Sequence, residues 1–492
     1  MLTTLLLLLC QEWKAELKDS AIPMRDGKSL AADIFLPPAA GKYPTVLIQT
    51  PYNRKGLGAP IGSGRGDGGE AGRGAVSDAL GLLDREHYAY VVVDWRGFYG
   101  SKGAMEGVRR GPWRRGQDGF DCVEWIAKQE WSDGKVGTWG GSALGRVQFE
   151  TALEHPPHLV CAVPLIAPMA QAYETYYENG LLLEAHVDTL DKLGFGVGEI
   201  VKRFPDPAAP AWRLAERTTY KPEEIRVPCL MITGWWDHYP DPVIRTFEDI
   251  AAKGGEAARK HSRLLVGPWD HVGIGLAKQG ELTFEGAAKY SAQMAKQFLD
   301  LHLRGEGKGI EPVVQWWTIG GGAWESAASW SGLKRATTTV ALKGGGAWAH
   351  DPKDPSPTLG GANLPPLKHG PHDQSALEKR KDVLRWDAAL EKPLRVNGNV
   401  ELSFEATADG DAFDVCARLC DGKGFLLADA ARRVKAKAGE KTRVTLRFPA
   451  TAVAARELRV YVAGSNWPRY EKGPAVSVTV HGGAELKLPT VE

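Results

Sequence analysis

Short apolar runs alternate with longer amphipathic stretches between residue 43 and about residue 305. The runs are rich in Val, Leu and Ile and end at or beside Gly, Pro or Asp, as buried parallel strands do. Six strands are predicted: Tyr43–Thr50, Tyr88–Asp94, Lys135–Gly140, Leu159–Leu165, Pro228–Thr233 and Arg263–Gly267. Because the runs are apolar throughout rather than alternating, we expect a sheet that is covered on both faces.

Amphipathic helices are predicted between several of these strands. They span Gly119–Gln129, Gly145–Glu154, Pro242–Lys253 and Ala287–Leu303. Strands that alternate with helices of this length predict an α/β unit with a parallel sheet. We assign residues 20–166 and 227–310 to this unit and expect it to be the catalytic domain.

The segment 167–226 interrupts this alternation. It contains Tyr173, Tyr176 and Tyr177, an apolar stretch over Leu181–Leu190, and a Pro-rich piece around Pro205–Pro210. We predict a mainly helical cap insertion, which would overhang the carboxyl ends of the strands as a lid or a pocket wall.

After residue 311 the predicted helices nearly disappear. Gly and Pro separate short alternating segments, including Thr337–Leu342, Val400–Ala406, Lys441–Phe448 and Leu458–Ala463. This pattern predicts a C-terminal all-β sandwich of the jelly-roll type over residues 311–492.

The first nineteen residues are predicted to form a tail. Their apolar run Leu5–Leu9, followed by Cys10, is similar to part of a signal peptide. No Lys or Arg precedes the run, and Leu9 is bulkier than the residue that usually precedes a lipoprotein cysteine. We expect a cytoplasmic protein, with export through this segment as the alternative.

Composition and charge narrow the function classes. A chain of 492 residues is expected to form two or three folding units. Its 61 Lys and Arg balance 60 Asp and Glu, so no nucleic-acid partner is expected.

No segment after the tail is apolar for long enough to span a membrane. Of the six cysteines, only Cys416 and Cys420 lie close together, so neither a zinc site nor a disulfide framework is expected.

A glycine-rich turn between a predicted strand and a predicted helix is the first sign of chemistry. Gly140 and Gly141 precede Ser142, and Ala143 and Gly145 follow it. Small neighbours are needed where a nucleophilic serine occupies a tight, strained strand-to-helix turn. The G-x-S-x-G pattern is incomplete, because Leu144 occupies the last Gly position, so a glycine-rich turn with an incidental serine is the alternative.

The position of the candidates in the predicted sheet strengthens the argument. Ligands of open α/β sheets bind at the carboxyl ends of the strands. Tyr52, Ser142, Asp237 and His271 each follow a different predicted strand. The order Ser, Asp, His is that of a nucleophile, an orienting acid and a general base in α/β-hydrolases.

Other polar residues near the strand ends are alternatives or structural groups. Asp270 and Asp241 compete with Asp237 as the triad acid, and His238 competes with His271 as the base. Asp94 and Arg96 are expected to form an ion pair that braces the loop beside the serine. The segment 64–69 formally contains G-x-G-x-x-G, but it follows its strand too late and opens no helix, so we interpret it as a loop.

The ordered motifs extend over roughly residues 20 to 475. Around Ser142 they are Ile22–Gly27, Leu30–Pro37, Thr50–Tyr52, Asp94–Gly97, Gly234–Asp237, Gly267–His271, His302–Gly305, Gly370–Gln374 and Ser465–Tyr470. In this set the chain resembles the cocaine esterase-type (CocE/NonD) serine hydrolases, which are related to X-prolyl dipeptidyl aminopeptidases and α-amino-acid ester hydrolases. The resemblance implies an α/β-hydrolase domain with a helical insertion and a C-terminal jelly roll.

The chemistry of a triad assigns a role to each residue. Ser142 is expected to attack an acyl carbonyl, His271 to accept its proton, and Asp237 to orient the imidazole. The backbone N–H of Ala143 is expected to stabilise the oxyanion. The resemblance implies that the Tyr52 hydroxyl is the second donor. Relatives usually carry Tyr at position 143, so the pocket beside the nucleophile is expected to differ here.

Aromatic residues flank the predicted site and suit an apolar or aromatic acyl group. The predicted pocket residues are Trp139, Tyr173, Tyr176, Trp235, Trp236 and Trp269. α-Amino-acid ester hydrolases carry acidic residues after the triad Asp, where this chain has Tyr239 and Pro240, which argues against that activity.

We therefore expect a serine esterase that acts on a small-molecule ester through an acyl-enzyme. Hydrolysis of an amide or of an X-Pro dipeptidyl substrate is the first alternative. A catalytically idle binding protein is the second, since jelly rolls often bind ligands. No cofactor or metal is expected, and a homo-oligomer is compatible with the sequence.

Overall fold

The larger of the two main sheets has ten strands. The structure is a computed structural model, and it describes residues 16–56, 84–108, 114–311 and 313–491 of the chain. The strand order is β1-β2-β4-β3-β5-β6-β9-β10-β13-β14, with all pairs from β4 to β13 parallel. The bounds are β1 Leu17–Pro23, β2 Ser29–Phe35, β3 Tyr43–Thr50, β4 Ala89–Asp94, β5 Ser132–Gly141, β6 Leu159–Leu165, β9 Leu230–Trp236, β10 Arg263–Asp270, β13 Val314–Thr318 and β14 Ala323–Ala327.

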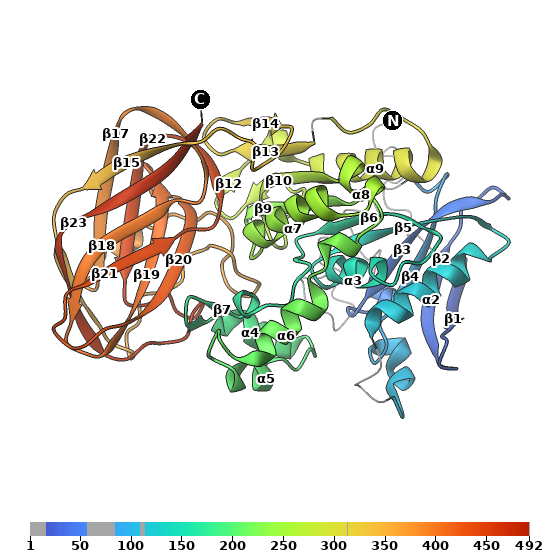
Figure 1. Cartoon of the computed structure of the whole chain (residues 1–492), viewed down its shortest axis with the longest axis horizontal. Helices are drawn as coiled ribbons and strands as arrows, with labels where there is room; N and C mark the ends of the chain where they lie inside the picture. Colours follow the sequence, from blue (N-terminus) through green and yellow to red (C-terminus); the bar gives the residue numbers. More distant parts are fainter. Residues whose placement is uncertain (1–15, 57–83, 109–113, 312, 492) are drawn as a thin grey trace, which may run out of the picture.

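Both faces of this sheet are covered, as predicted (Figure 1). Successive strand residues enter different cores: Leu47 packs with one cluster, and its neighbours Val46 and Ile48 pack with another. Helices α2 (Arg115–Ala127), α3 (Ala143–Ala152), α7 (Pro240–Lys253) and α8 (Glu256–His261) contribute to the first cluster. Helix α9 (Tyr290–Leu299) and the π-helical turn Asp300–Arg304 contribute to the second.

The predicted strands agree with this sheet, and β3 and β6 match their predicted bounds. Two edges were not predicted. The antiparallel strands β1 and β2 extend the sheet on one side. On the other side β13 and β14 lie beyond residue 311, so the boundary predicted there is too early for the sheet. Both pairs are short edge pieces without a following helix, which removes the alternation used for prediction.

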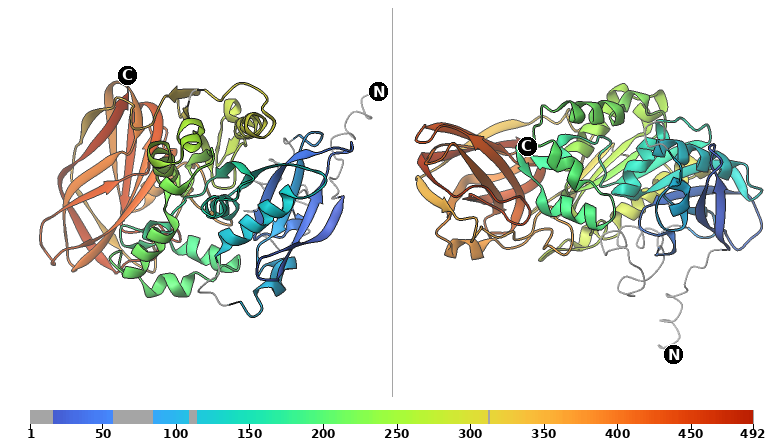
Figure 2. Two further views of the ribbon diagram at one scale, coloured as in Figure 1. Left: turned by 45° about the vertical axis from the view of Figure 1, so that its right-hand side comes forward. Right: turned by 90° about the horizontal axis from the view of Figure 1, so that it is seen from below.

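The insertion between β6 and β9 is mainly helical, as predicted, and forms a small core of its own. It contains the hairpin of β7 (Tyr177–Glu178) and β8 (Leu181–Leu182) and helices α4 (Glu184–Lys192), α5 (Gly198–Arg203) and α6 (Pro210–Thr219). Short 3-10 turns span Tyr173–Thr175 and Pro222–Glu224. The hairpin and α4 contact the C-terminal domain: the Trp467 indole donates to Glu184 at 3.1 Å. Figure 2 shows the insertion beside both larger parts.

The C-terminal domain is an antiparallel all-β jelly roll. Its main sheet has the order β20-β19-β22-β17-β23-β18-β21, and β15 and β16 also pair with β23. The bounds are β15 Ala336–Leu342, β16 Gly346–His350, β17 Val383–Gly398, β18 Glu401–Ala408, β19 Ala412–Asp421, β20 Leu426–Lys435, β21 Thr442–Arg447, β22 Thr451–Ala463 and β23 Val476–Val491. Two of the four predicted segments lie within β15 and β22, and the other two overlap β18 and β21 and extend one residue beyond their ends.

Several smaller predictions concern the ends and the cysteines. The five cysteines within the described ranges are buried free thiols. Among the helices that the structure describes, none combines the length and the apolarity needed to cross a membrane. The signal-like segment Leu5–Leu9, Cys10 and the loop 64–69 lie outside the described residues.

Candidate active site

Ser142 occupies a strained turn between β5 and α3. Its backbone has φ 57° and ψ −120°, which is outside the regions that a side-chain-bearing residue normally adopts. Its N–H donates to the Leu165 carbonyl at 2.9 Å, and its own carbonyl accepts from Arg146 N at 2.9 Å. The serine therefore stands at the carboxyl end of a central strand, directly before the N-terminus of a helix.

The missing glycine of the turn is compensated by its neighbours. Gly140 has φ 143°, and a Cβ placed there would lie 2.5 Å from the Leu144 Cβ. A Cβ on Gly145 would lie 2.6 Å from the Ala167 Cβ and 2.8 Å from the Leu165 carbonyl oxygen. Leu144 thus fills space that Gly140 leaves open, while Gly145 provides the close approach of helix to strand.

Gln148 is a buried side chain that the sequence reasoning missed. Its carbonyl accepts from Thr138 Oγ1 and from Val163 N, both at 3.0 Å. Its amide donates to the carbonyls of Gly140 and Leu144 at 3.1 Å. One side chain therefore ties α3 to β5 and β6 around the turn. Its signal in the sequence is a Gln on the otherwise apolar face of a predicted helix.

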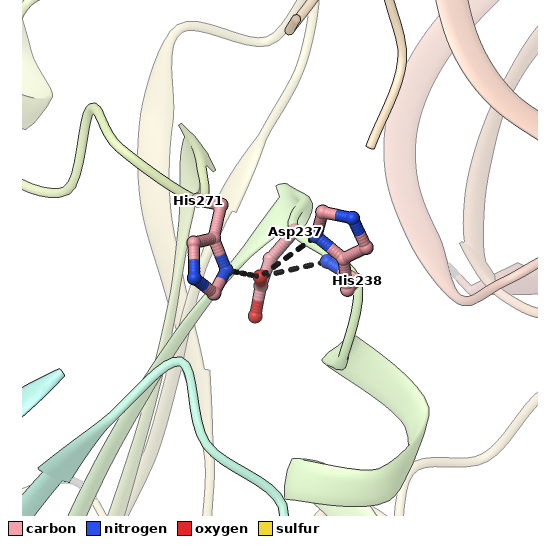
Figure 3. A group of neighbouring side chains, drawn as sticks. All are labelled: Asp237, His238 and His271. Carbon is pink, nitrogen blue, oxygen red and sulfur yellow. Dashed lines mark hydrogen bonds and ion pairs between the residues drawn. The ribbon is translucent and has the colours of Figure 1, made fainter. Parts of the chain in front are cut away.

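Asp237 and His271 come together at the ends of β9 and β10 (Figure 3). His271 Nδ1 lies 2.7 Å from Asp237 Oδ1, and both side chains are almost fully buried. Thr233 Oγ1 donates to the other carboxylate oxygen at 2.9 Å, and the His238 backbone N–H donates to Oδ1 at 2.7 Å. These donors fix the carboxylate, which orients His271 with Nδ1 toward the acid and leaves Nε2 as the free nitrogen.

The rival acids have other partners. Asp270 Oδ2 lies 2.8 Å from His369 Nδ1, and Asp241 accepts from the Asn399 amide at 2.9 Å. The rival base His238 has its ring Nδ1 4.0 Å from Asp237 Oδ1, which is too long for a hydrogen bond. Of the predicted candidates, Asp237 and His271 are the pair in direct contact.

Tyr52 follows β3, and the Ser142 side chain lies close enough to its hydroxyl to lower the pKa of the phenol, an effect that burial outweighs. Burial raises the pKa of Tyr52 to about 12, so the phenol keeps its proton at neutral pH. Its ring packs edge-on against Phe195 of the insertion, with centroids 6.3 Å apart. A protonated hydroxyl beside the serine can donate a hydrogen bond to a developing oxyanion.

Asp94 and Arg96 do not form the predicted ion pair with each other. Asp94 binds Arg54, whose N–H donates at 2.7 Å and whose guanidinium donates at 2.6 Å. Arg96 binds Asp118 at 2.7 Å and Asp26 at 2.8 Å. The two side chains diverge because β4 ends at Asp94 and Arg96 already lies in the loop that follows. Asp94 consequently braces the short loop that carries Tyr52.

A cavity of about 730 Å³ lies among the α/β domain, the insertion and the jelly roll. Its wall includes Asp237, His238, Tyr239, Tyr177 and the buried Arg469. None of the six predicted pocket aromatics is among its lining residues. Trp139, Trp235, Trp236 and Trp269 are buried in the two cores of the sheet, while Tyr173 and Tyr176 pack in the core of the insertion.

Two histidines that the sequence reasoning did not connect lie beside the Asp237–His271 pair. His186 of α4 and His238 have ring centroids 4.6 Å apart, and His238 is 5.3 Å from the His271 ring. His186 Nε2 lies 3.2 Å from the Tyr239 hydroxyl. Burial lowers the pKa of His186 to about 3 and that of His238 well below its ordinary value, so both are neutral. No sequence signal links His186 to a loop some fifty residues later.

Asp237, His238 and His271 are also the described residues whose grouping could hold a metal ion, with ligand atoms within 4.8 Å of one another. The 2.7 Å contact between Asp237 and His271 is a hydrogen-bond distance, which leaves no space for an ion between these atoms. The arrangement is therefore suited to proton transfer.

Comparisons with known proteins cover nearly the whole chain. The model of the X-Pro dipeptidyl-peptidase family (S15) matches residues 26–224 and 206–273. The model of the X-Pro dipeptidyl-peptidase C-terminal non-catalytic domain matches residues 307–485. A cocaine esterase from Rhodococcus sp. (strain MB1 Bresler) is 26% identical over 92% of this chain and 91% of its own length.

Solved structures share the fold at lower sequence identity. An aminopeptidase from a marine sediment Thaumarchaeota archaeon is 19% identical, with a TM-score of 0.79 over 97% of both chains. An α-amino acid ester hydrolase is 19% identical, with a TM-score of 0.76 over 96% of both chains. At this identity the two structures support the two-domain architecture.

Proposed function

The chain belongs to the X-Pro dipeptidyl-peptidase (S15) family of hydrolases, and on that premise we propose that it is a serine hydrolase of carboxylic esters. The observation that carries the proposal is the combination of a strained Ser142 with a buried Asp237–His271 pair at neighbouring strand ends. The cocaine esterase relative, which aligns over nearly the full chain, supports an ester as the substrate.

Acylation begins at Ser142. His271 Nε2 accepts the hydroxyl proton as Oγ forms a bond with the ester carbonyl carbon. The imidazolium that forms is stabilised by Asp237, whose carboxylate is already held by Thr233 and a backbone N–H. His271 then gives the proton to the leaving alcohol as the C–O bond breaks.

The oxyanion of the tetrahedral intermediate is stabilised by two donors in this proposal. One is the Tyr52 hydroxyl, which stays protonated at neutral pH. The other is the Ala143 backbone N–H, which belongs to the first turn of α3, where N–H groups have no acceptor within the helix. Each such donor typically contributes about 3–4 kcal/mol to the transition state. Water then attacks the acyl-enzyme by the same steps in reverse.

Amide or X-Pro dipeptidyl hydrolysis is the second candidate, because the family model that matches the chain is named for that reaction. The residues after Asp237 favour the ester. Tyr239 and Pro240 carry no negative charge for a substrate ammonium, and burial raises the pKa of Tyr239, which keeps the phenol neutral.

A fluorophosphonate probe tests the assignment of the nucleophile. We expect the wild-type protein and a Ser477→Ala control, which changes an exposed serine of β23, to be labelled. Ser142→Ala should not be labelled. Labelling that persists in Ser142→Ala would contradict Ser142 as the nucleophile and place it elsewhere. Folded wild type that resists the probe would contradict the proposal and favour an idle binding protein.

Turnover then separates the two candidate reactions. We expect higher kcat/KM on p-nitrophenyl and aromatic esters than on X-Pro p-nitroanilides. A higher kcat/KM on the X-Pro anilides would assign the protein to peptide hydrolysis instead.

A further inference from the structure

His238 presents an unused nitrogen beside the catalytic pair. The residue lines the 730 Å³ cavity, and its side chain is only 5% exposed. In Figure 3 its Nδ1 faces Asp237 and its Nε2 points away from that carboxylate. Among the described residues, neither ring nitrogen makes a hydrogen bond. Nδ1 is enclosed, so Nε2 is the nitrogen left to meet a ligand.

The surroundings of His238 decide which hydrogen-bonding role Nε2 plays. Asp237 Oδ1 lies 4.0 Å from Nδ1, and a nearby carboxylate favours the tautomer with its proton on that nitrogen. The ring cannot take a second proton near neutral pH, because it is buried and faces His186, His271 and the positive charge of Arg469. Nε2 is therefore a lone-pair acceptor.

The insertion holds the ring in this position. The ring of His186 of α4 packs against His238 at a tilt of 35°, with centroids 4.6 Å apart, and His186 Nε2 lies 3.2 Å from the Tyr239 hydroxyl. Burial keeps the Tyr239 phenol protonated, so this contact is a hydrogen bond between two neutral groups. A neutral acceptor is thus fixed by contacts from two parts of the chain.

We propose that His238 Nε2 selects esters that carry a neutral hydrogen-bond donor, such as a hydroxyl group, on the part of the substrate that fills this cavity. This rests on the proposed ester hydrolysis. A donor on the substrate would pair directly with Nε2, whereas an ether or an alkyl group in the same place would exclude water and leave Nε2 unpaired. The cavity wall carries acidic side chains, including Asp241 and Asp249, as well as Arg469, so its charge does not exclude an ammonium group. The amine analogue in the substrate series tests whether the preference is for a neutral donor.

Matched substrates test the preference. One series comprises p-nitrophenyl 2- and 3-hydroxybutanoates, their O-methyl ethers, the 2-amino analogue and butanoate. A second series carries the same changes on the alcohol part of a butanoate ester. In at least one series we expect kcat/KM for the hydroxy ester to exceed that of its methyl ether by about tenfold after correction for base hydrolysis. Equal values in both series, or a preference for the amine, would overturn the proposal.

Variants connect the preference to the imidazole. His238→Phe keeps a flat ring against His186 and should reduce the hydroxy-to-methoxy ratio of kcat/KM about tenfold. His238→Gln, which retains an acceptor, should keep most of the ratio and covers the case in which the Phe variant does not fold. His350→Phe is the matched control, because His350 is a buried histidine of β16 without hydrogen bonds among the described residues.

The outcomes distinguish this inference from the proposed function. Fluorophosphonate labelling with an unchanged ratio in His238→Phe removes only the selectivity of His238. Absence of labelling and of turnover on every ester removes the proposed hydrolysis itself. A ratio that also falls in His350→Phe would show a general packing effect and would likewise overturn the role of His238.

Discussion

Two groups of buried charged residues lie close to the insertion, and they differ in how completely their polar atoms are paired. At the strand ends, Asp237 is fully hydrogen-bonded, but His271 keeps one nitrogen free and Ser142 sits in a strained backbone conformation. In the jelly roll, Arg469 pairs with Asp429 at 2.8 Å.

The second group continues to the insertion, where its charged side chains contact protein partners. Glu178 of β7 accepts from the Tyr470 hydroxyl and from Ala431 N. Arg469 also donates to the Ala362 carbonyl and to Asn363 Oδ1. Buried polar groups of this kind stabilise an interface when paired, whereas a free nitrogen and a strained hydroxyl can react. The comparison predicts that mutations in the first group affect rate and mutations in the second affect stability.

The largest effect on rate is expected from Asp237→Asn. An amide cannot hold His271 in the tautomer with Nδ1 protonated, so kcat should fall on the order of 10⁴-fold. Steady-state kinetics on p-nitrophenyl esters measures this, with circular dichroism to verify the fold. Asp270→Asn, at the rival acid, is the control. A loss of similar size in the control alone would move the triad acid to Asp270.

A smaller loss of rate is expected from Tyr52→Phe. Removal of one oxyanion donor should lower kcat by about 10²- to 10³-fold, with KM nearly unchanged, since the donor acts in the transition state. Tyr177→Phe, which removes the hydroxyl of a cavity tyrosine that donates to the Val201 carbonyl, is the matched control. Equal kcat in wild type and Tyr52→Phe would exclude Tyr52 from the oxyanion site.

Asp94→Asn tests whether the Asp94–Arg54 pair acts through the loop of Tyr52. We expect kcat to fall roughly tenfold, because the loop loses its charged anchor. In the Tyr52→Phe background the same change should cost much less, since neighbouring residues in one network are non-additive. Fully additive losses in this double-mutant cycle would separate Asp94 from the oxyanion donor.

Asp429→Asn tests the prediction that mutations in the second group, around Arg469, affect stability rather than rate. Breaking a buried ion pair by removing one charge typically costs about 3–5 kcal/mol of stability. We expect a lower midpoint of urea unfolding, while kcat changes less than about threefold. A drop in kcat without loss of stability would show that the second group belongs to the chemistry as well.

The smallest effect concerns pH and Glu178. Burial raises the pKa of Glu178 to about 7, above its ordinary value near 4.5. The folded state therefore binds a proton that the unfolded state releases, and stability from this group decreases as pH rises from about 4.5 to about 7. Glu178→Gln should flatten that slope in unfolding measurements across the window. An identical slope in the variant would refute the raised pKa.

The strands of the larger sheet could be predicted well where helices cover both faces of the strand. The runs over Tyr43–Thr50 and Leu159–Leu165 lie between strands and under helices, so nearly every position is buried and the bounds are clear. The edge strands β1 and β14 each pair with a single neighbour, and their sequences contain no comparable run. They were not predicted because an edge strand with exposed positions has a weaker apolar pattern. The buried strand β2 was missed because no helix follows it.

The contact within the candidate pair was predictable, whereas the wall of the site was less so. Asp237 and His271 follow the adjacent strands β9 and β10, which accounts for their contact, while Ser142 follows β5 at the same edge and its role stays a prediction. The tryptophans near those ends looked like pocket residues, but Trp139 and Trp269 point into the core. A residue next to a strand end can face either way, and sequence position alone does not distinguish the two. His186 approaches only through the fold of the insertion.

The packing of the Leu144 side chain into the space beside Gly140 has a consequence for recognising such enzymes from sequence. A pattern that demands glycine two residues after the nucleophile treats each position independently and would pass over this chain. The positive φ at position 140 still requires glycine, and the space that Gly140 leaves open is filled by the Leu144 side chain. Sequence profiles that score the two positions jointly would recover hydrolases of this type.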